Sequence, residues 1–286
     1  MSIDKVPGEL QLYIGGLFTV RRRDLLEQCG ITHILSVLGL PLDQKLFDGF
    51  KHMVVEVDDT DDENLLEHFP ACVRFIQSAL DDGKGVLVHC AMGKSRSATV
   101  VCAYLMKHFN HTPEEALALL RQSRPFCDPN DGFRSQLQIY HDTNMSDDLE
   151  NSTIYQRWMY QREIETSRAV GQAPGLIKIH FEDEHQSEGT FIDLEMKCKK
   201  CRRILATSQY LVTHQPASGA DPSSCAHYFL DPLSWMRPEL EQGKLEGRLE
   251  CPKCSTNVGK YAWQASTEQT IRSRTRESMI GLDYIL

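Results

Sequence analysis

One stretch decides the fold of this chain: Val86-Leu87-Val88-His89-Cys90-Ala91-Met92-Gly93-Lys94-Ser95-Arg96-Ser97. Its apolar start predicts a buried strand that ends at His89-Cys90, and residues 97–105 predict a helix. Gly93 marks the turn between the two. A loop between a strand and a helix N-terminus can direct successive backbone N–H groups inward, at the positive end of the helix dipole. The stretch therefore predicts a binding site for a tetrahedral oxyanion.

Two side chains of this stretch give the site its chemistry. Arg96 can reach the same concavity as Cys90, where a planar guanidinium holds two phosphate oxygens at once. Cys90 would lie at the floor, and the N–H groups, the helix dipole and Arg96 all favour its thiolate over its thiol. Cys90 is therefore the candidate nucleophile. The alternative is a buried structural cysteine followed by an unrelated arginine.

The run from His89 to Ser97 resembles the signature loop of the cysteine-dependent protein tyrosine phosphatases, in their dual-specificity branch. This resemblance covers roughly the first half of the chain. It implies a phosphocysteine intermediate on Cys90, with Arg96 clamping the phosphoryl group and no cofactor needed for catalysis. It also implies that phosphate lies against the residues that follow the nucleophile: Ala91, Met92, Gly93, Lys94, Ser95 and Arg96.

Acidic residues crowd the segment 58–63, which follows an expected strand. Breaking the phosphate ester needs a proton on the leaving oxygen, and a carboxylic acid above the phosphate can supply it. In the resembled family this acid lies on such a loop, roughly thirty positions before the nucleophile. The resemblance therefore implies Asp59 as the general acid, with Asp58 as the second choice. An acidic loop that is merely solvated is the alternative.

Two further residues of the signature loop have expected roles. Ser97 could donate a hydrogen bond to the sulfur of Cys90 and help it leave in the second step, and a capping role at the helix start is equally compatible. His89 is expected to orient the loop through hydrogen bonds, because a base beside an ionised thiolate would be redundant.

The expected substrates are phosphoproteins carrying phosphotyrosine, phosphoserine or phosphothreonine. Phosphoinositide-directed relatives tend to carry a second lysine directly after the nucleophile, where this chain has Ala91. Lys94 adds only one positive charge at the rim of the loop, so a lipid substrate is the lesser alternative.

Strands alternate with helices along the first half of the chain, which predicts an α/β domain with a mainly parallel central sheet flanked by helices. Residues 124–137, with Asn130 and Phe133, resemble the loop and last helix that buttress the family's active site. The expected strands lie at 8–14, 33–38, 52–57 and 86–90, and the expected helices at 22–29, 64–80, 97–105 and 113–122.

A chain of 286 residues is long for one ordinary domain. We expect a phosphatase domain over 1–147, a connecting helix and linker over 148–189, a small, mostly-β zinc-binding domain over 190–263 and a divergent tail over 264–286. The sequence shows neither a membrane-spanning apolar stretch nor a secretory signal, so we expect a protein of the cytoplasm and nucleus with no membrane partner.

Two Cys-x-x-Cys pairs mark the expected second domain. In a reducing compartment, closely paired cysteines indicate metal binding rather than disulfides. Cys198, Cys201, Cys251 and Cys254 can present four thiolates in the tetrahedral arrangement of structural zinc. Free surface thiols are the alternative.

A phosphatase domain followed by such a zinc domain resembles a subgroup of the same family. In that subgroup the zinc domain is expected to hold two metal ions, with further ligands in a Cys-x-Cys pair after a tryptophan. Trp263 is present here, but no cysteine follows Cys254. His214 and Cys225 would form only a partial second site, so we expect one zinc ion.

The subgroup also suggests an alternative function. Its zinc domain is linked to maturation of the large ribosomal subunit, which implies an assembly factor that acts independently of catalysis. Four basic residues around the first cysteine pair could contact pre-ribosomal RNA or a ribosomal protein, and a solvated rim is the alternative. These residues are Lys199, Lys200, Arg202 and Arg203.

Overall fold

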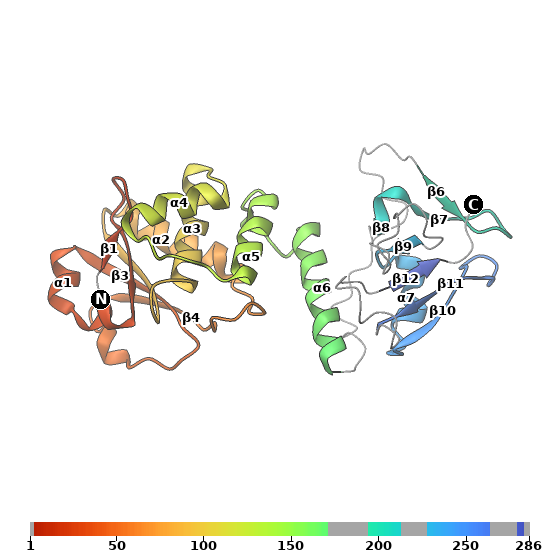
Figure 1. Ribbon diagram of the computed structural model, residues 1–286, viewed down its shortest axis with the longest axis horizontal. Coiled ribbons are helices and arrows are strands. Elements are labelled where there is room, and N and C mark those ends of the chain that lie inside the picture. Colours follow the sequence, from red (N-terminus) through yellow and green to blue (C-terminus); the bar gives the residue numbers. More distant parts are fainter. Residues whose placement is uncertain (1–2, 171–193, 213–227, 264–278, 283–286) are drawn as a thin grey trace. The chain divides into compact units, whose positions relative to one another are not determined.

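The computed structural model describes residues 3–170, 194–212, 228–263 and 279–282 (Figure 1). The chain divides into two compact units, Met1–Tyr155 and Gln156–Leu286, and each is described here by itself. Within the described ranges, none of the helices combines the length and the apolar character that crossing a membrane requires.

The first unit is built on a five-stranded sheet with the order β1-β2-β5-β3-β4. The strands β2, β5, β3 and β4 run parallel to one another, and the short edge strand β1 is antiparallel to β2. The predicted mainly parallel α/β architecture is therefore confirmed. Every residue of the central strand β5 is buried, which explains its continuous apolar run. The strands are β1 (Asp4–Lys5), β2 (Leu12–Gly16), β3 (Ile31–Val37), β4 (Lys51–Val55) and β5 (Gly85–Cys90).

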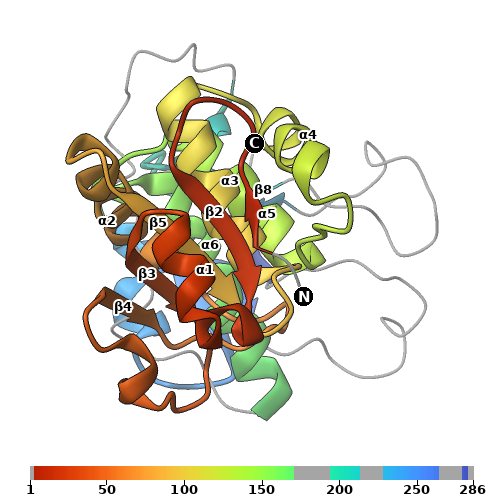
Figure 2. The ribbon, with the colours of Figure 1, turned by 90° about the vertical axis from the view of Figure 1, so that its left-hand side faces the viewer.

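Helices cover both faces of this sheet, with α1 in front and α3 and α5 behind it in Figure 2. Because successive strand side chains point to opposite faces, Tyr13 and Leu87 pack with Leu26 of α1, while Val86 and Val88 face the other helical layer. The helices are α1 (Arg23–Gln28), α2 (Phe69–Asp81), α3 (Arg96–Phe109), α4 (Pro113–Ser123) and α5 (Asp131–Asp142). Single 3-10 turns are η1 (Leu17–Arg21), η2 (Gln44–Phe47) and η3 (Leu66–His68).

Local sequence explains where the helices near the site begin. The side chain of Asn130 accepts a hydrogen bond from the backbone N–H of Phe133, 2.8 Å away, and thereby caps α5. The helix that periodicity predicts over 64–80 instead begins with η3, because the N–H groups of Leu65 and Leu66 donate to a side chain of α5. α5 therefore contacts the acidic segment directly.

The second unit is small and mainly β, as predicted. A five-stranded antiparallel sheet has the order β10-β11-β12-β9-β8, and a separate hairpin pairs β6 with β7. Its core includes Trp235, Tyr261 and Trp263, together with Tyr160 and Ile164 of α6. The elements are α6 (Thr153–Val170), β6 (Glu195–Lys197), β7 (Ile204–Thr207), η5 (Ser208–Tyr210), β8 (Leu211–Val212), β9 (Tyr228–Leu230), η7 (Ser234–Met236), α7 (Arg237–Leu240), β10 (Glu246–Glu250), β11 (Asn257–Ala262) and β12 (Met279–Leu282).

Candidate active site

The catalytic loop, residues 90–96, connects the end of β5 to the start of α3. Gly93 adopts a φ of +71°, and a Cβ added there would lie 2.5 Å from the carbonyl oxygen of Gly15. The loop therefore requires glycine at this position. Arg124 supports the loop from behind: its Nε donates to the Gly93 carbonyl oxygen at 2.7 Å, its Nη2 donates to that of Met92 at 3.0 Å, and Asp4 pairs with its charge.

Cys90, whose sulfur lies at the floor of this loop, is 1% exposed. The backbone N–H of Gly93 and the hydroxyl of Ser97 both donate to it, each at 3.2 Å. Both donors point at the sulfur, where a negative charge would lie during the reaction of a cysteine nucleophile. The structure thus places Ser97 within reach of the sulfur, at the start of α3.

Arg96 is 7% exposed and is the first residue of α3. Its Nη1 donates to the carbonyl oxygen of Val57 at 2.9 Å, which fixes the guanidinium plane. Its buried Nε has no hydrogen-bond partner in the described part of the chain and lies 3.7 Å from Oδ2 of Asp59. A buried donor without a partner costs free energy, and a phosphoryl oxygen bound in the loop would satisfy it.

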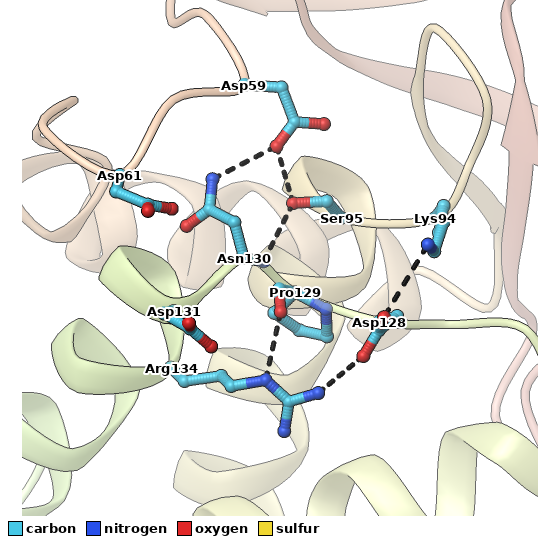
Figure 3. Close-up of a pocket in the computed structure, with 9 residues that line it drawn as sticks. All are labelled: Asp59, Asp61, Lys94, Ser95, Asp128, Pro129, Asn130, Asp131 and Arg134. Carbon is cyan, nitrogen blue, oxygen red and sulfur yellow. Dashed lines mark hydrogen bonds and ion pairs between the residues drawn. The ribbon is translucent and has the colours of Figure 1, made fainter.

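Asp59 reaches over the catalytic loop from the acid loop, residues 58–65. Figure 3 shows Ser95 and Asn130 pointing at the same carboxylate oxygen, Oδ1, to which they donate at 2.6 and 3.1 Å. The other oxygen, Oδ2, faces Arg96. Asp58 lies elsewhere, because a Cβ added at Gly39 would overlap its carboxylate. Of the two candidate acids, the structure joins Asp59 to the catalytic loop.

His89 is fully buried behind Cys90. Its Nε2 lies 2.6 Å from the hydroxyl of Ser36, which lies 2.8 Å from Nε2 of His52. Burial lowers the pKa of His89 to about 4, so the ring is neutral near pH 7 and suited to orienting the loop. Sequence reasoning missed Ser36 and His52. Ser36 contacts His89 because the two residues are paired in the parallel register of β3 and β5. Finding this contact from the sequence would have required knowing that register.

Comparisons with known proteins agree with this geometry. The family model described as dual specificity phosphatase, catalytic domain, matches residues 12–143. Tyrosine-protein phosphatase yvh1 of Schizosaccharomyces pombe is 37% identical over 255 residues, which cover 88% of this chain and 76% of that protein. The chain belongs to the dual-specificity phosphatase family. Dual specificity protein phosphatase 12 of Mus musculus is 33% identical over 281 residues, which cover 92% of this dual-specificity phosphatase and 81% of the mouse protein.

A solved structure is also similar to the first unit of this dual-specificity phosphatase. The Yvh1 phosphatase domain from Chaetomium thermophilum matches with a TM-score of 0.48 and 36% identity, covering 51% of this chain and 99% of that chain.

A polar cavity of about 610 Å³ adjoins the catalytic loop of this phosphatase (Figure 3). Asp128 lies between Lys94, at 3.5 Å, and Arg134. The hydrogen bond from Arg134 holds the pKa of the Asp128 carboxyl below its usual value. Arg121 also lies 3.3 Å from Asp128, so Lys94 shares this carboxylate with two arginines. The lining residues are Asp59, Asp61, Lys94, Ser95, Asp128, Pro129, Asn130, Asp131 and Arg134.

The second unit of the phosphatase contains the four-cysteine cluster. The Sγ atoms of Cys198, Cys201, Cys251 and Cys254 all lie within 4.8 Å of one another, so the cluster could hold a metal ion. The Sγ pairs at 3.5 and 3.7 Å are far longer than a disulfide bond of about 2.05 Å.

Both cysteine pairs turn in the same way. The residue directly after each second cysteine has a positive φ, 61° at Arg202 and 50° at Ser255. The two turns thereby direct their thiols toward a common point. His214 and Cys225, predicted as a partial second site, lie outside the described residues.

Proposed function

We propose that the chain hydrolyses phosphotyrosine, phosphoserine and phosphothreonine in proteins through a phosphocysteine intermediate on Cys90. The observation that carries the proposal is the pairing of a buried sulfur, which accepts two hydrogen bonds, with a buried guanidinium whose Nε makes no hydrogen bond within the described residues. One group is an activated nucleophile and the other is ready to bind a phosphoryl oxygen.

The residues suggest a two-step reaction. The Cys90 thiolate attacks phosphorus, the bond to the substrate oxygen breaks, and Asp59 gives that oxygen its proton from Oδ2. Water then attacks the phosphocysteine and gives a proton to the Asp59 carboxylate. The sulfur leaves as a thiolate, stabilised by the hydroxyl of Ser97 at 3.2 Å. Arg96 binds the phosphoryl oxygens in both steps.

The charge around the catalytic loop favours a phosphoprotein over an inositol lipid. Ala91 follows the nucleophile, and the Lys94 ammonium lies 3.5 Å from Asp128. A polyphosphorylated headgroup would need uncompensated positive charge at this rim.

Substrate choice can be measured with one peptide sequence synthesised with phosphotyrosine, phosphoserine or phosphothreonine at the same position. We expect release of phosphate from all three peptides, and at least about tenfold slower release from soluble phosphoinositide at equal concentration, because four carboxylates and only two cations line the cavity beside the loop. Faster turnover of the lipid, or hydrolysis of phosphotyrosine alone, would contradict the proposed specificity.

A second candidate function rests on the second unit, where the four cysteines are proposed to hold one structural zinc ion. Lys199, Lys200 and Arg202 are exposed beside the cluster. A hollow of about 250 Å³ is lined there by Lys199 and Lys200 together with Asn257. Positive charge around a hollow suits RNA phosphates or an acidic protein segment, which supports a role in assembly of the large ribosomal subunit.

The assembly role can be tested in the full chain. We expect one equivalent of zinc, because the described residues contain one complete ligand set, and we expect Cys251→Ser to lose both the metal and sedimentation with pre-ribosomal particles. Lys253→Ser, which changes an exposed residue of the same turn, is the matched control. Continued sedimentation of Cys251→Ser without metal would show that the association does not act through the zinc site, and two zinc equivalents would exclude the single site.

A further inference from the structure

A single buried side chain joins the acid loop to helix α5. Gln136 is 1% exposed. Its Oε1 accepts hydrogen bonds from the backbone N–H groups of Leu65 and Leu66 at 2.9 and 2.8 Å. Its Nε2 donates to the carbonyl oxygen of Glu63 at 2.7 Å. One amide thus fixes three backbone groups at the end of the acid loop.

The same helix contacts the acid loop at two other points. A Cβ added at Gly132 would overlap the carbonyl oxygen of Asp61, so the backbones of the two segments are in close contact there. Asn130, which caps α5, donates to the carboxylate of Asp59 at 3.1 Å. Because residues four apart lie on one face of a helix, Gly132 and Gln136 present a continuous surface to the loop.

We propose that Gln136 is a positioning residue for the hydrolysis. It fixes the distance of the acid loop from α5 and thereby the position of the Asp59 carboxyl relative to the leaving oxygen. The inference rests on the assignment of Asp59 as general acid in the proposed function. Leu65 and Leu66 are fully buried, so their N–H groups can reach water only if the loop lifts away from α5. A misplacement of about 1 Å can slow a reaction by about 10²-fold.

The effect should be confined to the steps in which Asp59 moves a proton. In the described residues, the hydrogen bonds of Gln136 go only to the acid loop and the start of η3, and none goes to Cys90 or Arg96. Loss of Gln136 should therefore leave oxyanion binding unchanged. A substrate with a strongly acidic leaving group needs little proton donation to form the phosphocysteine, so its kcat/KM, which reports the steps up to that intermediate, should change little as well.

The test compares Gln136→Met with the parent on two aryl phosphates. For phenyl phosphate, whose leaving group is poor, we expect kcat/KM to fall about 10- to 100-fold. For 2,4-dinitrophenyl phosphate we expect kcat/KM to change about twofold or less, because proton donation contributes little to its reaction with Cys90. Gln136→Glu keeps an acceptor for the two N–H groups and should recover part of the loss. The matched control is Gln138→Met, since Gln138 is exposed on the same helix and its side chain bonds to Asp142.

A double variant separates this proposal from a general structural role. If Gln136 acts through Asp59, then Gln136→Met should cause no further loss in an Asp59→Asn background. An equal loss with both substrates, or a further loss in that background, would overturn the positioning role while Asp59 keeps its assignment. If Asp59→Asn itself showed no dependence on the leaving group, the acid assignment and this inference would both be wrong. Should Gln136→Met fail to fold, the same comparisons are made with Gln136→Glu.

Discussion

Replacing Cys90 with serine should lower turnover of an aryl phosphate by at least about 10⁴-fold, because a serine hydroxyl is not ionised near neutral pH and is a much weaker nucleophile than a thiolate. The anion site should survive, since the Gly93 N–H and the Arg96 guanidinium belong to the backbone and to α3. Single-turnover assays measure the loss, and calorimetry with inorganic phosphate measures the retained binding.

Cys29→Ser is the matched control for this substitution. Cys29 follows α1, is half-buried and lies in the same unit of the chain. Its replacement should leave turnover within about twofold of the parent, as is usual for substitutions away from a site. Unchanged turnover of Cys90→Ser would show that the sulfur is not the nucleophile.

Replacing Asp59 with asparagine should lower kcat/KM by about 10² to 10⁴-fold for poor leaving groups and affect kcat/KM for good leaving groups little, because kcat/KM reports the steps up to formation of the phosphocysteine. An asparagine oxygen can still accept from Ser95 and Asn130, so the loop keeps its contacts and loses only the proton. A series of substituted phenyl phosphates measures how kcat/KM depends on the leaving group.

Asp58→Asn is the control for the acid, because its carboxylate packs against Gly39 rather than the catalytic loop. We expect the same leaving-group dependence for Asp58→Asn as for the parent. If the steep dependence appeared instead in Asp58→Asn, the acid would be Asp58.

The parts of the site that sequence predicts are local. Cys90, Arg96 and Ser97 belong to one uninterrupted stretch between a strand and a helix, so a buried run, a glycine and a helix start are enough to bring them together. The four-cysteine cluster can be predicted for a similar reason. Each Cys-x-x-Cys pair forms its own local turn, and only two such turns must come together.

The supporting residues could not be predicted in this way. Gln136 contacts backbone groups about 70 positions earlier in the chain, and hydrophobic periodicity carries no information about such distant contacts. Ser36 and His52 reach His89 only because β3 lies between β4 and β5 in the sheet. That strand order is a property of the whole domain and not of any window of sequence.

The Arg124 contacts have a practical consequence for anyone who expresses this protein. The charge that balances Arg124 comes from Asp4, on an edge strand of two residues at the very start of the chain. Arg124 in turn bonds the carbonyl oxygens of Met92 and Gly93 in the catalytic loop. A recombinant version trimmed past Asp4 would lose this carboxylate, and Arg124 would then hold the phosphate cradle without that ion pair.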